Sequence, residues 1–231
     1  MELRAHALLF DLDGVLVDSH GTVERTWRRW AARHGLDADT LLAVAHGRRT
    51  WDTLQAVVPQ LDPAREVAWL DAAELEDVEG VVAVSGAAAL LEGLAAGTWA
   101  IVTSCGRELA RRRLAHAALP VPDVVVTSED VARGKPAPDG YRLGARRLGV
   151  GPASCVVFED APPGLEAARA AGCRVIALTT THAAERLAAA DAIVPDLAAV
   201  SVRRGASGYA VGLRGEHRAS ARRDPRGRVA P

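Results

Sequence analysis

The chain has 231 residues, of which 49% are hydrophobic and 25% are charged, and its formal net charge is −1 at pH 7. This length fits one domain, or one domain with a smaller one inserted, and the composition is typical of a soluble globular protein. A charge so close to zero gives no general reason to expect nucleic acid or an anionic membrane as a partner.

The first residues and the cysteines indicate a cellular compartment. Met1 to Arg4 lead directly into a strand-like segment, without the pattern of a signal peptide, and no apolar run is long enough to span a bilayer. The three cysteines (Cys105, Cys155 and Cys173) are an odd number without the spacing of a disulfide framework. We therefore expect a cytoplasmic protein, either monomer or homodimer, without a membrane or nucleic-acid partner.

Six short apolar runs, bounded by turn or acidic residues, predict buried β-strands. They are Ala7–Phe10, Trp99–Val102, Val124–Val126, Cys155–Phe158, Val175–Leu178 and Ala192–Val194. Helical patterns separate most of these runs, at Gly86–Ala96, Arg107–Ala117, Pro138–Leu148 and Pro163–Ala171. Strands that alternate with helices predict parallel pairing through right-handed crossovers. The expected fold is therefore α/β, with a Rossmann-like parallel sheet flanked by helices.

The alternation stops between Ser19 and Ser85, where only helical patterns occur. Thr22–His34 carries apolar residues at helical spacing, and Asp62-Pro63 is a cap and first-turn signal for a helix through Leu70. We predict an all-helical cap domain at residues 19–85, inserted into an α/β core made of residues 1–18 and 86–202. Its tryptophans are expected in the cap core: Trp27, Trp30 and Trp69.

Residues 203–231 differ in character from the rest of the chain. They hold eight arginines and few large apolar residues beyond Tyr209, Val211 and Leu213. Burial of so little apolar area cannot offset the conformational entropy that the segment would lose on ordering. We therefore expect most of this arginine-rich tail to be mobile.

Acidic pairs follow two of the predicted strands. Asp11 and Asp13 come after the first strand, and residues two apart in an extended chain face the same way. Glu159 and Asp160 follow the strand that begins at Cys155. The carboxyl ends of parallel strands are where open α/β sheets bind ligands, and placing carboxylates together is costly unless a cation or a proton neutralises them. These hard oxygen ligands suit Mg²⁺.

Two further strand ends offer groups that bind anions. Ser104 follows the strand that ends at Val102 and precedes a helix, where a hydroxyl and free backbone amides can hold an anion. Lys135 is the only lysine of the chain, which otherwise uses arginine for positive charge. A site that needs a compact ammonium instead of a planar guanidinium would explain this choice, and such an ammonium can hold an aspartate charged and neutralise a phosphoryl group.

Four segments carry these residues, namely FDLDGVLVDS, VTSCG, GKPAPD and VVFEDAPPGLEAARAAG. They resemble the four motifs of the haloacid dehalogenase-like hydrolase superfamily, in family order and spanning Leu8 to Gly172. A helical cap inserted after the first motif resembles the phosphatase and phosphoglucomutase subgroup of that superfamily.

The resemblance implies a role for each matched residue. Asp11 is the nucleophile that forms an aspartyl-phosphate, and Asp13 first protonates the leaving alcohol and then activates water. Phosphoryl oxygens are held by a hydroxyl, nearby amides and the ammonium, through Leu12, Asp13, Ser104, Cys105 and Lys135. Mg²⁺ is held by Asp11, the Asp13 carbonyl oxygen and Asp160, with Glu159 bound directly or through water. The thiol of Cys105 has no paired base, so we interpret it as a small packing group.

Other chemistries of the superfamily fit less well. Phosphonoacetaldehyde hydrolases use a cap lysine, which this cap lacks, and dehalogenases lack the second aspartate of the first motif, which is present here as Asp13. The β-phosphoglucomutases use a cap lysine and a histidine early in the cap. At the matching distance this sequence has Val23, and His20 is offset by three residues.

The stretch Ala45–Thr53 looks like the specificity loop of sugar- and polyol-phosphate phosphatases. Its candidate substrate contacts are two arginines for a phosphate or hydroxyl, an aromatic ring for a sugar face and a glycine: Arg48, Arg49, Trp51 and Gly47. We therefore predict a Mg²⁺-dependent phosphatase whose partner is a small-molecule phosphate ester of a sugar or polyol. The open alternatives are β-phosphoglucomutase-like phosphoryl transfer, a phosphoglycolate-type phosphatase, and a phospho-acceptor or binding module without enzymatic activity.

Overall fold

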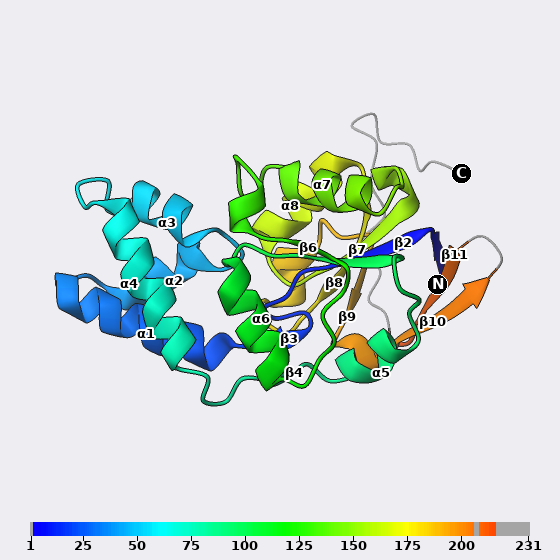
Figure 1. The fold of residues 1–231 in the computed structure, drawn as a ribbon, viewed down its shortest axis with the longest axis horizontal. Coiled ribbons are helices and arrows are strands. Elements are labelled where there is room, and N and C mark those ends of the chain that lie inside the picture. The colour runs from blue at the N-terminus through cyan, green and yellow to red at the C-terminus, as the bar shows by residue number, and fades with distance from the viewer. Residues whose placement is uncertain (1, 206–207, 216–231) are drawn as a thin grey trace.

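The central sheet has six parallel strands in the order β6-β5-β2-β7-β8-β9 in the computed structural model, which describes residues 2–205 and 208–215 (Figure 1). The strands are β2 (Ala7–Phe10), β5 (Trp99–Val102), β6 (Val124–Val126), β7 (Cys155–Glu159), β8 (Arg174–Leu178) and β9 (Ala192–Val194). Each begins and ends within one residue of the predicted run. The parallel α/β sheet is confirmed.

Helices cover both faces of this sheet. They are α5 (Ala87–Glu92), α6 (Arg107–His116), α7 (Asp139–Arg147) and α8 (Pro162–Ala171). Side chains alternate along β2, so that Leu8 and Phe10 pack with α5 and α6, whereas Ala7 and Leu9 pack with α7 and α8. Figure 1 shows these two helix layers above and below the strands. Short 3-10 turns complete the connections: Ser128–Asp130, Pro152–Ser154, Ala184–Leu187 and Leu197–Ala199.

Four helices form a separate group at the left of Figure 1: α1 (His20–His34), α2 (Ala38–Ala45), α3 (Thr50–Val57) and α4 (Pro63–Glu76). Asp62 caps α4 by accepting from the Ala64 amide at 3.1 Å, as the Asp-Pro signal predicts. Trp27 and Trp30 are buried in the core of this group and Trp69 packs partly buried against it. We call these four helices the cap.

The cap is connected to the core by a ribbon that the sequence analysis missed. Strand β3 (Val17–Asp18) pairs antiparallel with β4 (Val82–Ala83). β4 lies inside the segment predicted to contain helices only, and that part of the prediction is wrong. A strand of two residues is too short to produce a periodic pattern. The domain boundaries near residues 18 and 85 stay a prediction.

A second, antiparallel sheet corrects the predicted end of the core. β1 (Glu2–Ala5), β11 (Gly208–Leu213) and β10 (Val200–Gly205) pair in that order. The boundary at residue 202 is therefore wrong, because β10 continues through it. Tyr209 and Val211 are buried in the core, and the Tyr209 hydroxyl accepts from the Ala95 amide at 2.9 Å. Residues 206–207 and 216–231 of the predicted tail lie outside the described residues.

No helix within residues 2–205 and 208–215 has both the length and the apolar character needed to cross a membrane.

Candidate active site

The predicted site residues meet at the carboxyl ends of the parallel strands. Asp11 follows β2 and Glu159 ends β7, and these two strands are paired, with Phe10 opposite Phe158. The two phenylalanine rings stack with their centroids 4.8 Å apart, and the Asp11 amide donates to the Phe158 carbonyl at 3.0 Å. The strand ends that carry the acids are thus held together by both backbone and side chains.

Lys135 lies between two of the acids. Its Nζ is 2.8 Å from Asp11 Oδ2 and 2.6 Å from Glu159 Oε1, and only 6% of its side chain is exposed. Burial lowers the pKa of Lys135, but the two carboxylates outweigh that effect and raise the pKa above its usual range. The ammonium therefore stays charged.

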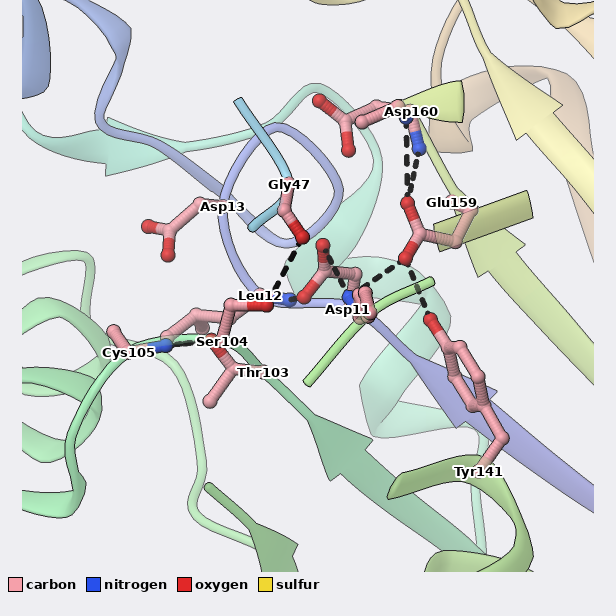
Figure 2. Close-up of polar contacts among 12 residues, drawn as sticks. Asp11, Leu12, Asp13, Gly47, Thr103, Ser104, Cys105, Tyr141, Glu159 and Asp160 are labelled. Carbon is pink, nitrogen blue, oxygen red and sulfur yellow. Dashed lines mark hydrogen bonds and ion pairs between the residues drawn. The ribbon is translucent and has the colours of Figure 1, made fainter. Parts of the chain in front are cut away.

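Glu159 is held on both oxygens. Its Oε1 accepts from Lys135 and from the Tyr141 hydroxyl, at 2.6 Å each, and its Oε2 accepts from the amides of Asp160 and Ala161 at 3.0 and 3.3 Å. Figure 2 shows Tyr141 reaching Glu159. These four contacts fit a carboxylate that orients Lys135.

Carboxylate oxygens of Asp11, Glu159 and Asp160 lie within 4.8 Å of one another, and all three residues are buried. Burial raises the pKa of Asp11 to about 7, against the opposing effect of Lys135. Burial, followed by the charges of Glu159 and Asp11, also raises the pKa of Asp160 well above its usual range. So dense a group of buried carboxylates has more negative charge than one ammonium offsets. The donor set therefore fits a divalent cation.

Two glycines allow the chain to pass close to these acids. Gly14 has φ +76°, and a Cβ there would lie 2.0 Å from Asp160 Oδ2. A Cβ on Gly164 would lie 1.7 Å from Glu159 Oε1. The loop after β2 and the first turn of α8 can therefore approach the acid cluster this closely only with glycine at these positions.

Asp13 has different partners from Asp11. Its Oδ2 is 2.9 Å from Arg113 Nη1, and its Oδ1 accepts from the Ser19 hydroxyl at 2.7 Å. Asp11 and Asp13 line one cavity, as their spacing predicts. In Figure 2, however, the Asp13 carboxylate points away from Asp11 and Asp160.

The predicted phosphate-binding groups bond to one another or to the cap. The Leu12 amide donates to Asp11 Oδ1 at 2.8 Å, and the Cys105 amide donates to Thr103 Oγ1 at 3.2 Å. The Ser104 hydroxyl donates to the Gly47 carbonyl at 3.0 Å, so this core residue contacts the cap loop (Figure 2). Burial raises the pKa of the Cys105 thiol to about 12. A neutral thiol packed against the core fits the interpretation of its side chain as a packing group.

A cavity of about 100 Å³ lies between these residues and the cap. Gly47 and Arg48 line it, as predicted, but Arg49 and Trp51 do not. Arg49 instead pairs with Asp52 and donates to the carbonyls of Val131 and Ala132 at 3.1 and 3.2 Å, in the loop that carries Lys135. Trp51 is 42% exposed. The cavity wall instead contains Trp27, which was predicted only as a core residue, together with His20 and His46.

The sequence analysis also missed Arg113, Glu74 and Tyr141, although patterns marked two of them. Arg113 follows Leu109 and Ala110 on the buried face of α6, and Glu74 follows Leu70 on the buried face of α4. A charged residue at an apolar helix position indicates a buried partner. Tyr141, the third, had no such pattern.

Comparisons with known proteins agree with this geometry. A family model described as haloacid dehalogenase-like hydrolase matches residues 5–172. Hexitol phosphatase A of Escherichia coli is 44% identical over 89% of this chain and 98% of its own length. Fructose-1-phosphate phosphatase of the same organism is 36% identical over 73% of this chain and 94% of its own. The crystal structure of a hydrolase from Pseudomonas syringae superposes with a TM-score of 0.74 at 25% identity, covering 83% of this chain and 94% of that one.

The raised pKa of Asp11 predicts how the stability of the metal-free protein depends on pH. Between its ordinary pKa of 3.8 and the folded value of about 7, folded Asp11 holds a proton that the unfolded chain has released. The free energy of unfolding should therefore fall as the pH rises from about 4 to about 7, and Asp160 adds to the effect. We expect Asp11→Asn to have a shallower dependence, since it removes that group.

Urea unfolding at several pH values between 5 and 8, in EDTA and in excess MgCl₂, measures this dependence. A divalent cation binds the deprotonated carboxylates, so it should stabilise the wild type most at the higher pH values. Equal pH dependence of the wild type and Asp11→Asn, with no stabilisation by the cation, would contradict the assignment.

Proposed function

Because the chain belongs to the haloacid dehalogenase-like hydrolase family, we propose that it is a Mg²⁺-dependent phosphatase that hydrolyses a small sugar or polyol phosphate. The match to the family model and two relatives named as phosphatases support the reaction class. The names of these relatives, a hexitol phosphatase and a fructose-1-phosphate phosphatase, support the substrate class.

The contact that carries the proposal is the one between Lys135 and Asp11. A carboxylate nucleophile and a phosphate monoester are both anionic, so positive charge is needed where they meet. The ammonium, 2.8 Å from Asp11 Oδ2, supplies such a charge beside the nucleophile and lies in reach of a phosphoryl group bound there. Glu159 and Tyr141 hold this arrangement from the buried side.

In the first step of the proposed reaction, Asp11 attacks phosphorus and the bond from phosphorus to the ester oxygen breaks. Asp13 gives its proton to the departing alcohol. In the second step, Asp13 takes a proton from water, which attacks the aspartyl-phosphate, releases inorganic phosphate and restores Asp11. The Ser104 hydroxyl and the amides of Leu12 and Cys105 hold phosphoryl oxygens once substrate replaces their present partners.

The metal ligands proposed are Asp11, the Asp13 carbonyl oxygen and Asp160. The four hydrogen bonds accepted by Glu159 favour its acting through water instead of by direct ligation. When bound, Mg²⁺ supplies further positive charge beside the phosphoryl oxygens.

The residue at the position of the mutase histidine, and the lack of a cap lysine, favour hydrolysis over mutase chemistry. Val23, at the position matching the histidine of β-phosphoglucomutases, lies in the cavity wall and has no group that transfers a proton. The cap also contains no lysine. A phosphoglycolate-type phosphatase and a binding protein without activity are distinguished from the proposal by the assay below.

Release of inorganic phosphate should occur with hexitol or sugar phosphates in the presence of Mg²⁺ and stop in EDTA. The panel includes hexitol 6-phosphates, fructose 1-phosphate, glycerol 1-phosphate, glucose 1-phosphate and phosphoglycolate. Asp11→Asn should lose at least about 10³-fold in kcat, because it removes the nucleophile but keeps its size.

Two outcomes would overturn the proposal. Preference for phosphoglycolate would change the substrate class. Absence of turnover with every substrate, together with unchanged ligand binding by Asp11→Asn, would indicate a binding protein.

Arg48 and Arg49 should affect different kinetic constants. Arg48 lines the cavity, so Arg48→Ala should raise KM about tenfold with little change in kcat, as expected for lost ground-state binding. Arg49 contacts the loop that carries Lys135, so Arg49→Ala should lower kcat through displacement of the ammonium. Steady-state kinetics on the best substrate of the panel measures both. An unchanged KM in Arg48→Ala would exclude Arg48 from substrate binding.

A further inference from the structure

Arg113 is a buried guanidinium that joins the core to the cap. It lies on α6 with 3% of its side chain exposed, and it contacts two carboxylates through two different nitrogens. Nη1 is 2.9 Å from Asp13 Oδ2, and Nη2 donates to Glu74 Oε2 at 2.6 Å. Glu74 belongs to α4 of the cap and is itself 8% exposed. All three side chains line the cavity.

Burial of three charged groups together is costly unless their geometry is well matched. Apolar residues of similar size at positions 74 and 113 would join α4 to α6 without that cost, so stability alone does not account for the charges. The planar fork of arginine fixes the directions of its hydrogen bonds to two separate carboxylates, whereas the ammonium of a lysine rotates on a flexible stem and does not fix them.

Arg113 and Ser19 together determine where the Asp13 carboxylate points. The Ser19 hydroxyl, next to the start of α1, donates to Oδ1, and Arg113 contacts Oδ2. Ser19, immediately before the cap, thus contacts Asp13 directly, and α4 of the cap contacts Asp13 through Glu74 and Arg113. Other contacts between cap and core, Ser104 with Gly47 and Arg49 with Val131 and Ala132, do not involve Asp13.

We propose that Arg113 is a positioning residue that directs Asp13 toward the leaving-group oxygen, and that Glu74 makes this position depend on docking of the cap. The inference rests on the proposed function, because it assigns Asp13 the proton transfer to the departing alcohol. It adds two residues, one from each part of the molecule, that act on the reaction without contacting the reacting atoms.

Leaving groups of different basicity test this role. An alkoxide departs only when it is protonated, whereas p-nitrophenolate departs without a proton. The comparison uses kcat/KM, which covers binding through phosphoryl transfer. General acid catalysis contributes about 10²- to 10⁴-fold, so misdirection of Asp13 should cost a large part of that factor for a polyol phosphate.

Arg113→Lys is the main variant, because it keeps the charge but replaces the rigid planar fork that orients both carboxylates with a flexible ammonium. We expect its kcat/KM to fall at least about 30-fold for hexitol 6-phosphate and less than about 3-fold for p-nitrophenyl phosphate. Glu74→Gln, which keeps the size and one acceptor oxygen of Glu74, should show the same selectivity at about 3- to 10-fold. The double variant with both Arg113→Lys and Glu74→Gln completes the comparison. If it loses about as much kcat/KM for the polyol phosphate as Arg113→Lys alone, the two residues act as a unit.

Glu66→Gln is the matched control. Glu66 is another buried acid of α4, but it accepts hydrogen bonds from Trp30 and contacts His34 within the cap, away from Arg113. Its substitution perturbs the cap without touching Asp13, so any loss should be equal for the two substrates. Thermal unfolding of each variant confirms that it is folded at the assay temperature.

Three results would contradict the inference or the proposed function. Equal losses on both substrates in folded Arg113→Lys and Glu74→Gln would show a purely structural ion pair and overturn the inference. A raised KM for the polyol phosphate with unchanged kcat would indicate that the pair binds substrate hydroxyls, and would also overturn it. Failure of the wild type to hydrolyse either ester would contradict the proposed function itself.

Discussion

The structure depends on the contact of one buried ammonium with two buried carboxylates. Lys135 reaches both Asp11 and Glu159 only because β2 and β7 are adjacent and parallel and the loop after β6 crosses toward them. Each carboxylate alone would be costly at that depth, and Asp11, Glu159 and Asp160, once deprotonated, carry more negative charge than Lys135 offsets. That residual charge connects fold to function, since it creates a place for a cation and for the phosphate that a cation neutralises.

Much of the arrangement of the sheet and of this cluster could be predicted from the sequence. The six buried strands have continuous apolar runs that end in acidic or turn residues, and parallel pairing places such ends at one edge of a sheet. Asp11, Glu159, Asp160 and Lys135 could therefore be placed together before any coordinates were known. The single lysine in an arginine-rich chain pointed to the same site by its chemistry.

The remaining features depend on contacts between distant parts of the chain. Tyr209 and Val211 have the alternating spacing of a strand. They are buried, however, because β11 pairs with β1 and because the Tyr209 hydroxyl contacts the Ala95 amide. Neighbouring Arg48 and Arg49 look equivalent in the sequence, yet only Arg49 contacts Asp52 and the loop that carries Lys135 and so lies outside the cavity wall. Arg113 and Glu74 are 39 residues apart and meet only when the cap lies against α6. The positions of Arg113 and Glu74 on apolar helix faces indicate that both are buried, but they do not identify the partner of either.

A crystal structure of the protein with Mg²⁺ and beryllofluoride, a mimic of the aspartyl-phosphate, tests the central claim most directly. The account predicts beryllium bonded to an Asp11 oxygen, Mg²⁺ on Asp11 and Asp160, and Lys135 Nζ within hydrogen-bond distance of both Asp11 and a fluoride. Beryllofluoride bound elsewhere, or Lys135 turned away from Asp11 in the loaded site, would contradict it.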